Sequence, residues 1–274
     1  MALRELGKRP GKFLDHLGEE LAFYLRALSW APRTVRHYRK EIMRLLAEVT
    51  LGTGALAVIG GTVGVIVSMC FFTGTEVGLQ GYAALNQLGT APLTGFVSAY
   101  FNTREIAPLV AGIALAATVG CGFTAQLGAM RISEEVDALE VMAVPSLPYL
   151  VTTRIIAGLI AIVPLYVVGL LSSYFATRLT VTKGYGQSAG TYDHYFHAFL
   201  PPGDVLWSFG KVLVFAVVVI LIHCYHGYTA SGGPAGVGVA VGKAVRTSIV
   251  AINVIDLMLS MAIWGTSTTV RLAG

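Results

Sequence analysis

Five apolar stretches, almost free of charged side chains, dominate this sequence of 274 residues. They lie at about 50–72, 106–130, 150–174, 205–225 and 248–269. Each is long enough to cross the hydrocarbon core of a bilayer as a helix. Charged residues make up 12% of the chain, about half the roughly 25% typical of soluble domains. The sequence therefore predicts an all-α integral membrane protein and excludes a soluble enzyme, a disordered tail and a fibrous protein.

The first stretch is unusually rich in glycine. Its glycines are Gly52, Gly54, Gly60, Gly61 and Gly64. Glycine lets helices approach closely but weakens the helix that contains it, so a full crossing and a re-entrant segment both remain open. The segment 74–102 that follows carries one acid, Glu76, and no Lys or Arg. We therefore expect an outer loop there.

The N-terminal region, residues 1–48, predicts a helix on the membrane surface. From 13 to 28, apolar side chains recur every three or four residues with charged side chains opposite them, a pattern too polar to span a membrane. A soluble helical bundle would show the same pattern, but the apolar stretches that follow favour the membrane surface. The Lys and Arg residues between 33 and 44 suit anionic headgroups.

The distribution of basic residues predicts the orientation of the chain. Ten of the 19 Lys and Arg residues precede position 45. The positive-inside rule then makes the N-terminus cytoplasmic, and five crossings bring the C-terminus to the periplasmic side. These bases do not alternate with exposed aromatic residues on a soluble module, so nucleic acid is not an expected partner.

The cytosolic segment after the second stretch predicts a short helix at about 133–143. Ser133 suits the N-cap, and acidic residues follow in the first turn. Val136, Leu139 and Met142 are three residues apart and form an apolar ridge between acidic flanks. Such a ridge can dock a soluble motor domain, and it can equally belong to an ordinary solvated connector.

Four ionisable residues fall within the spans or at their ends. They are Arg104, Glu105, Lys211 and Asp256. All four fit one level in the outer half of the membrane, where each charge would offset another and the group could line a polar path or orient a lipid headgroup. The alternative is that Arg104 and Glu105 mark the interface and that Lys211 snorkels towards it.

No motif nominates a catalytic residue. The sequence has no G-x-x-x-x-G-K-[ST], G-x-S-x-G or H-E-x-x-H motif, so ATP hydrolysis would belong to a partner. Two histidine pairs, His194 with His197 and His223 with His226, have metal-ligand spacing but no third ligand nearby. We interpret them as interfacial side chains and expect neither a metal nor another cofactor in this chain.

Four segments resemble one family of transporters. They are Arg104-Glu-Ile-Ala-Pro108, Ala125-Gln-Leu-Gly-Ala-Met-Arg131, Glu134-Glu-Val-Asp-Ala-Leu-Glu-Val-Met142 and Arg154. With them the chain resembles the MlaE/YrbE permeases of ABC lipid transporters, over nearly its whole length. The segment 223–234 resembles the B-type YrbE subunit of actinobacterial Mce systems. The family motif usually written Arg-Glu-Leu-Gly-Pro has Ile106 and Ala107 in its middle here.

The resemblance implies that residues 49–274 form a permease domain in the bacterial inner membrane. It implies a second, A-type YrbE permease subunit, two cytosolic MlaF-like ATPase subunits that bind ATP and Mg, and periplasmic MCE-domain proteins in a ring or tube. The implied function is the movement of hydrophobic membrane lipids, such as fatty acids or sterols, between the inner membrane and the MCE tunnel. The chain itself would not be an enzyme.

The resemblance also assigns site residues. The coupling helix that contacts the ATPase corresponds to Glu134, Glu135, Asp137, Ala138, Leu139 and Met142. Arg104, Glu105, Lys211 and Asp256 correspond to charged positions near the family's lipid pocket. Two alternatives remain for the function: a structural scaffold for the MCE assembly and an ATPase-independent lipid carrier.

Overall fold

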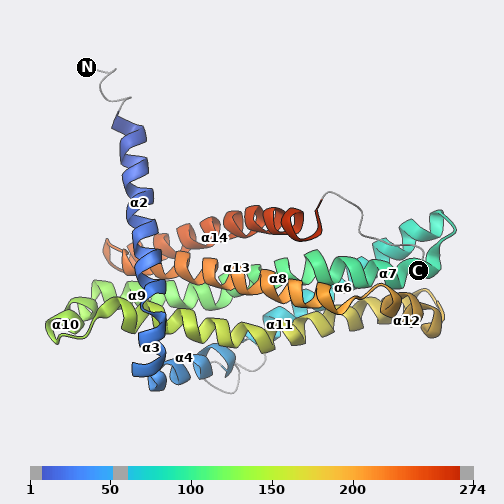
Figure 1. The fold of residues 1–274 in the computed structure, drawn as a ribbon, viewed down its shortest axis with the longest axis horizontal. Helices are drawn as coiled ribbons and strands as arrows, with labels where there is room; N and C mark the ends of the chain where they lie inside the picture. The colour runs from blue at the N-terminus through green and yellow to red at the C-terminus, as the bar shows by residue number, and fades with distance from the viewer. Residues whose placement is uncertain (1–7, 52–60, 266–274) are drawn as a thin grey trace.

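The computed structural model describes residues 8–51 and 61–265, and every regular element in these ranges is helical. Figure 1 shows a long bundle of helices, crossed towards one end by the N-terminal helix α2 (Lys8–Ser29). Two further helices, α3 (Ala31–His37) and α4 (Arg39–Leu51), follow α2 along the chain. The predicted all-α class is confirmed.

Five helical segments in the described part of the chain are long and apolar enough to cross a membrane, as predicted. They are α6 (Thr62–Gln87), Ala91–Ile132, Leu147–Gly184, α13 (Pro202–Tyr228) and α14 (Gly233–Trp264). The second comprises η1 (Ala91–Leu93), α7 (Thr94–Val97), η2 (Ser98–Ile106), α8 (Ala107–Leu115), η3 (Ala116–Gly120) and α9 (Cys121–Ile132). The third comprises η4 (Leu147–Thr152), α11 (Thr153–Leu179) and η5 (Thr180–Gly184). Two short helices, α10 (Glu135–Val141) and α12 (Ala189–Ala198), lie between spans.

The first span begins later than predicted. The sequence indicates 50–72, whereas α6 runs from Thr62 to Gln87; residues 52–60 lie outside the described part of the chain. A helix of 26 residues is about 39 Å long. α6 is therefore long enough for a complete crossing and does not have the length of a re-entrant segment.

The predicted outer loop at 74–102 is wrong. α6 extends through its first half, and the second span already starts at Ala91. Low hydropathy suggests a loop here, but Gly74 and Gly78 are buried against the third span, because small residues let membrane helices pack closely. The segment 227–246, whose many glycines would suggest a connection between two spans, is also mostly helical, since α14 starts at Gly233.

The contact between α6 and α11 depends on a position without a side chain. A Cβ atom at Gly74 would lie 2.4 Å from the backbone oxygen of Ser173. The Gly74 carbonyl accepts a hydrogen bond of 2.7 Å from the Thr177 hydroxyl, and that hydroxyl oxygen accepts one of 2.9 Å from Asn102 Nδ2. Close backbones and polar side chains thus join α6, α11 and η2, as expected for helices that pack within a membrane.

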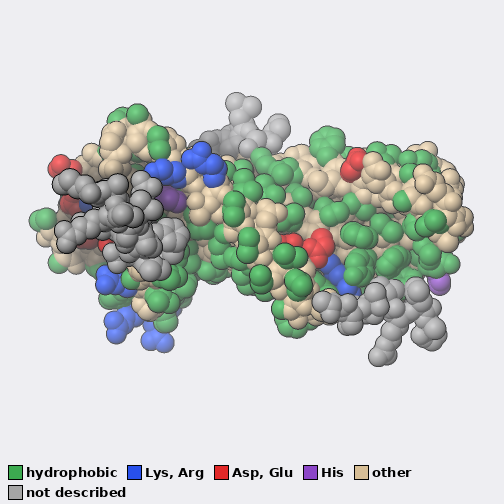
Figure 2. Space-filling model, turned by 90° about the horizontal axis from the view of Figure 1, so that it is seen from above, with side chains coloured by type: hydrophobic (Ala, Val, Ile, Leu, Met, Phe, Trp, Pro, Cys, Tyr) green, Lys and Arg blue, Asp and Glu red, His purple; other side chains and the backbone are tan. Residues whose placement is uncertain are grey.

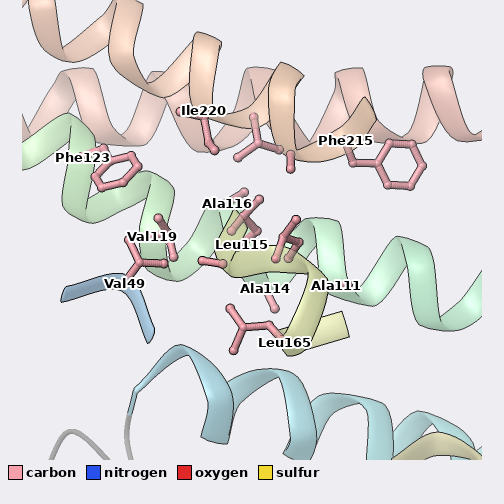
Figure 3. Close-up of a cluster of buried hydrophobic side chains, with 14 of the residues drawn as sticks. Val49, Ala111, Ala114, Leu115, Ala116, Val119, Phe123, Leu165, Phe215 and Ile220 are labelled. Carbon is pink, nitrogen blue, oxygen red and sulfur yellow. The ribbon is translucent and has the colours of Figure 1, made fainter. Parts of the chain in front are cut away.

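The centre of the bundle is filled by small and branched side chains. Figure 3 shows Ala111 and Leu115 on α8 between Leu165 on α11 and Phe215 on α13. All four are buried. The small residue on α8 allows the second span to pass between its neighbours, so α8 forms the middle of the core.

Helix α2 crosses the bundle and has two different faces. The ring of Phe23 lies 5.4 Å from that of Tyr225, and the Ala27 carbonyl accepts a hydrogen bond from Thr152. Leu21 and Leu25 are exposed, which agrees with a location at the membrane surface. In Figure 2, Lys and Arg gather towards this end of the molecule, whereas hydrophobic side chains cover most of the longer remainder.

We expect Gly74→Ala to destabilise the chain, because the added methyl group meets the backbone of Ser173 rather than a side chain that can rotate away. Overpacking of this kind costs about 1–3 kcal/mol. The measurement is the thermal unfolding midpoint of the full chain in one detergent, which should fall by several degrees. Gly122→Ala is the control, since its Cβ would meet no atom of the described residues within 4 Å. An equal change in both variants would contradict the close contact.

Candidate functional site

Three charged side chains from three spans meet inside the bundle. Lys211 on α13 places its Nζ 2.7 Å from Asp256 Oδ1 on α14 and 3.4 Å from Glu105 Oε2 on η2. The Lys211 side chain is 0% exposed. The structure therefore excludes the alternative in which this lysine snorkels to the interface.

Hydrogen bonds complete the surroundings of the Lys211 ammonium. It donates to the backbone oxygen of Arg104 at 2.7 Å and to Ser260 Oγ at 2.8 Å. The Ser260 hydroxyl donates in turn to Glu105 Oε1 at 2.8 Å. A charge can remain buried when ion pairs and hydrogen bonds of this kind replace its hydration.

Arg104 belongs to a second ion pair directly beside the first. Its guanidinium contacts Asp204 Oδ2 at 2.6 Å and lies 4.2 Å from the centre of the Tyr100 ring. Trp264 Nε1 donates to Asp204 Oδ1 at 3.0 Å. Arg104 and its backbone oxygen therefore connect this pair to Lys211.

Asp204 is not among the residues predicted from the sequence. It follows two prolines and a glycine at the first turn of α13, where a loop end is the ordinary interpretation. Its partner Arg104 is 100 positions away in the sequence, so no local pattern reveals the pair. Only a general rule points to such an acid in the sequence: an arginine buried in a membrane span requires an acidic side chain nearby.

The five side chains form what we call the Lys211 cluster: Arg104, Glu105, Asp204, Lys211 and Asp256. Fully ionised, it carries two positive and three negative charges. The cluster reaches the surface of the isolated chain mainly through Glu105, whose side chain is 37% exposed. Figure 2 shows acidic and basic side chains grouped within an otherwise hydrophobic face. The cluster thus offers polar contacts at an apolar surface.

Helix α10 protrudes from the bundle beyond α2 (Figure 1). It begins at Glu135, and Glu134, with a φ of 61°, precedes it as the N-cap. Ser133 is therefore not the N-cap, contrary to the prediction. Its hydroxyl donates to the Ala129 carbonyl at 3.0 Å and so caps the end of α9 instead. Ala143, with a φ of 58°, is a second left-handed residue just after α10.

The exposed surface of α10 differs from the predicted apolar ridge. Val136 is buried and Leu139 is half-buried against the core. Of the three residues of the predicted ridge, only Met142 is exposed. Val141 adds to it, with 88% of the residue exposed. The other exposed positions of the predicted set are Glu134, Glu135, Asp137 and Ala138. A short helix that rests on α9 needs an inward face, and the branched apolar side chains occupy it.

Polar contacts attach α10 to two spans. The Ser146 hydroxyl donates to Glu140 Oε1 at 2.6 Å and lies 2.8 Å from the hydroxyl of Tyr228 at the end of α13. Arg131 at the end of α9 forms an ion pair of 2.6 Å with Asp137. Helix α10 is therefore linked to α9 by an ion pair and to α13 through Ser146.

The histidine pairs have different surroundings. In the described ranges, no three His, Cys, Asp or Glu side chains are grouped to hold a metal ion. His197 is exposed, and its Nδ1 lies 2.7 Å from the Asp193 carbonyl oxygen. His223 is fully buried, with Nδ1 2.8 Å from the Thr124 hydroxyl. The interfacial interpretation is therefore wrong for His223, which joins α13 to α9 inside the bundle.

Known proteins resemble the chain over most of its length. The family described as Permease MlaE matches residues 52–262. A probable ABC transporter permease protein of Rickettsia bellii is 29% identical over 93% of this chain and 95% of its own length. The intermembrane phospholipid transport system permease protein MlaE of Haemophilus influenzae is 25% identical over 95% and 96%. The chloroplastic protein TRIGALACTOSYLDIACYLGLYCEROL 1 of Arabidopsis thaliana is 32% identical over 70% of this chain and 56% of that protein.

The family match includes the charged residues Arg104 to Asp256 and the whole of α10. In ABC transporters the permease is the membrane subunit, and ATP hydrolysis takes place in a separate subunit. The chain therefore belongs to the MlaE permease family: it is a multi-pass inner-membrane subunit of an ABC transporter, is not an enzyme, and works with a partner ATPase and other transport components.

Proposed function

We propose that this chain is one half of the permease of a Mce-type lipid transporter and corresponds to its B-type YrbE subunit. An A-type YrbE subunit completes the permease, two MlaF-like ATPase subunits bind ATP and Mg, and MCE-domain proteins form a periplasmic tunnel. Hydrophobic lipids, such as fatty acids or sterols, move between the inner membrane and this tunnel. The N-terminus is cytoplasmic and the C-terminus periplasmic in this arrangement. The relative from Haemophilus influenzae, named for intermembrane phospholipid transport, supports a lipid substrate.

The observation that carries the proposal is the Lys211 cluster. Charged groups within a bilayer are unfavourable and mark ion or substrate pathways. Lys211 is sealed inside, whereas Glu105 reaches a surface that is otherwise apolar. This combination suits a molecule with one polar end and a long apolar body. Arg104, Glu105, Lys211 and Asp256 form the lipid-pathway site in this proposal, and Asp204 holds Arg104 in place.

Helix α10 is the coupling helix of the proposal. Val141 and Met142 present exposed apolar side chains to the ATPase. The exposed acidic residues Glu134, Glu135 and Asp137 lie beside this apolar contact, and the exposed Ala138 follows them in the helix. Leu139 packs against the core and so supports the helix from the bundle side. An apolar contact with a charged rim is the ordinary composition of a protein interface.

Helix α13 connects the coupling helix to the charged cluster. Its end at Tyr228 contacts Ser146, which is bonded to α10 through Glu140. Lys211 lies earlier on the same continuous helix, about 26 Å away at 1.5 Å per residue. ATPase closure against α10 would shift α13 as a rigid body and change the contacts of Lys211 with η2 and α14.

A double variant tests the lipid-pathway role. Lys211→Met alone would leave buried carboxylates unpaired, which destabilises a protein by about 3–5 kcal/mol. Lys211→Met with Asp256→Asn removes one charge of each sign and keeps the net charge of the cluster. We expect the complex with the ATPase to assemble and lipid transfer to fall roughly tenfold or more, because a hydrogen bond to a charged group contributes about 1.5–3 kcal/mol.

The measurement is transfer of labelled lipid between proteoliposomes that contain the full complex and the MCE proteins. Arg178→Met with Asp193→Asn is the matched control, since it removes an exposed ion pair of 2.8 Å outside the cluster. This control should transfer lipid at the original rate. Unchanged transfer by the assembled Lys211 variant would reject the pathway role.

A second variant tests the coupling role of α10. Val141→Asp with Met142→Asp places two charges in an apolar contact, where charges without partners are unfavourable. Both positions are exposed in the chain alone, so membrane insertion should be unaffected. We expect co-purification of the ATPase with the tagged permease to be lost. The control is Leu88→Asp, at a similarly exposed leucine after α6, and this variant should still co-purify with the ATPase. If the α10 variant also co-purifies with the ATPase, the ATPase docks elsewhere.

A further inference from the structure

A cavity of about 670 Å³ lies between α3 and the loop that follows α10. Its wall on the N-terminal side is formed by Trp30, Arg33, Thr34, Arg36, His37 and Tyr38. The opposite wall is formed by Ala143, Val144 and Pro145 of the loop that follows α10, and by Pro148 on η4. None of the residues of the Lys211 cluster lines this cavity, so it is a separate site.

The cavity wall carries positive charge. Arg33 and Arg36 line it, and His37 adds a further positive charge when it is protonated. Among the residues that the structure describes, no Asp or Glu lines the wall, and the sequence holds none between Glu20 and Glu41. Those two acids are bonded elsewhere, Glu20 to the Tyr24 hydroxyl and Glu41 to Arg44. The cavity therefore keeps a positive potential that attracts an anion.

Thr34 adds a donor to the same wall. It is only 1% exposed, and its hydroxyl has no hydrogen-bond partner within the described ranges. Buried hydroxyl groups in proteins are nearly always hydrogen-bonded. An oxygen-rich anion in the cavity would supply the acceptor after a side-chain rotation.

The surroundings of the cavity belong to a membrane surface rather than to open solvent. Two apolar side chains near the cavity are exposed: Leu28, close to the end of α2, and Val35 on α3. Trp30 and Tyr38 line the cavity itself, and such aromatic residues concentrate at the level of lipid headgroups. The Arg33 guanidinium lies 5.3 Å from the centre of the Trp30 ring, so the basic and aromatic groups share one place.

We propose that this cavity binds the phosphate headgroup of an anionic phospholipid from the leaflet that α2 contacts. Arg33 and Arg36 pair with the phosphate, and the acyl chains extend past the exposed apolar side chains of Leu28 on α2 and Val35 on α3. Because the opposite wall is formed by the loop after α10 and by Pro148 on η4, an occupied cavity fixes the connection between α10 and the third span. The lipid is then a structural ligand of the coupling loop, independent of the lipid that is transported.

The test uses the full chain purified in detergent and measures retained lipid by native mass spectrometry. The probes are phosphatidylglycerol and phosphatidylcholine with identical acyl chains. We expect the chain to retain phosphatidylglycerol preferentially, and Arg33→Gln with Arg36→Gln to weaken this retention roughly tenfold or more. Arg39→Gln with Lys40→Gln is the matched control, because it removes the same charge from residues that do not line the cavity; it should retain the lipid.

Two variants of Thr34 and a competitor complete the test. Thr34→Val should weaken retention and Thr34→Ser should keep it. Equal loss in both double variants would indicate general surface charge. Displacement of the lipid by inorganic phosphate at equal concentration would indicate a site for a free anion. If the Arg33 and Arg36 double variant keeps the lipid but no longer co-purifies with the ATPase, the cavity would be a protein-docking surface instead. Each of these results leaves the transport proposal standing, because none measures transfer.

Discussion

An ammonium group buried among membrane-spanning helices is stable only while carboxylates stay next to it. Lys211 meets this condition with Glu105 from the second span and Asp256 from the fifth. Because both partners come from other helices, one buried cation fixes the relative positions of three spans. Arg104 and Asp204 repeat the arrangement one contact away, so the spans are held together here by charge as well as by apolar packing.

The other side of the bundle is held differently. α6 and α11 meet backbone to backbone at Gly74 and Ser173, with the Thr177 hydroxyl bonded across the contact. Such a contact leaves no room for a larger side chain, since even a methyl group exceeds the available space. The chain therefore combines a closely packed pair of helices with a charged contact between α13, η2 and α14. Helix α10, the coupling helix of our proposal, is linked to α13 through Ser146 and Tyr228.

Composition and charge spacing predicted the membrane class, the five spans and the members of the cluster apart from Asp204. They failed where distant parts of the chain decide the local structure. The second half of α6, polar and glycine-containing, is helical, and Gly74 and Gly78 pack there against residues 173–180, about a hundred positions later in the chain. Val136 faces inward because α10 rests on the bundle, which spacing within α10 cannot reveal. The bases near Arg33 were visible in the sequence, but the cavity needs the loop at Ala143 to close it.

Helix α14 is the least buried of the five spans in the described chain, yet it supplies Asp256 and Ser260 to the cluster. Moving α14 away from α13 therefore breaks an ion pair as well as apolar contacts. The strength of an ion pair depends on its surroundings: two charges 4 Å apart attract by about 1 kcal/mol in water and several times more in a protein interior. Water that reached Lys211 would weaken this ion pair, so a hydrated contact between α13 and α14 would separate at a lower cost in free energy than the dry one.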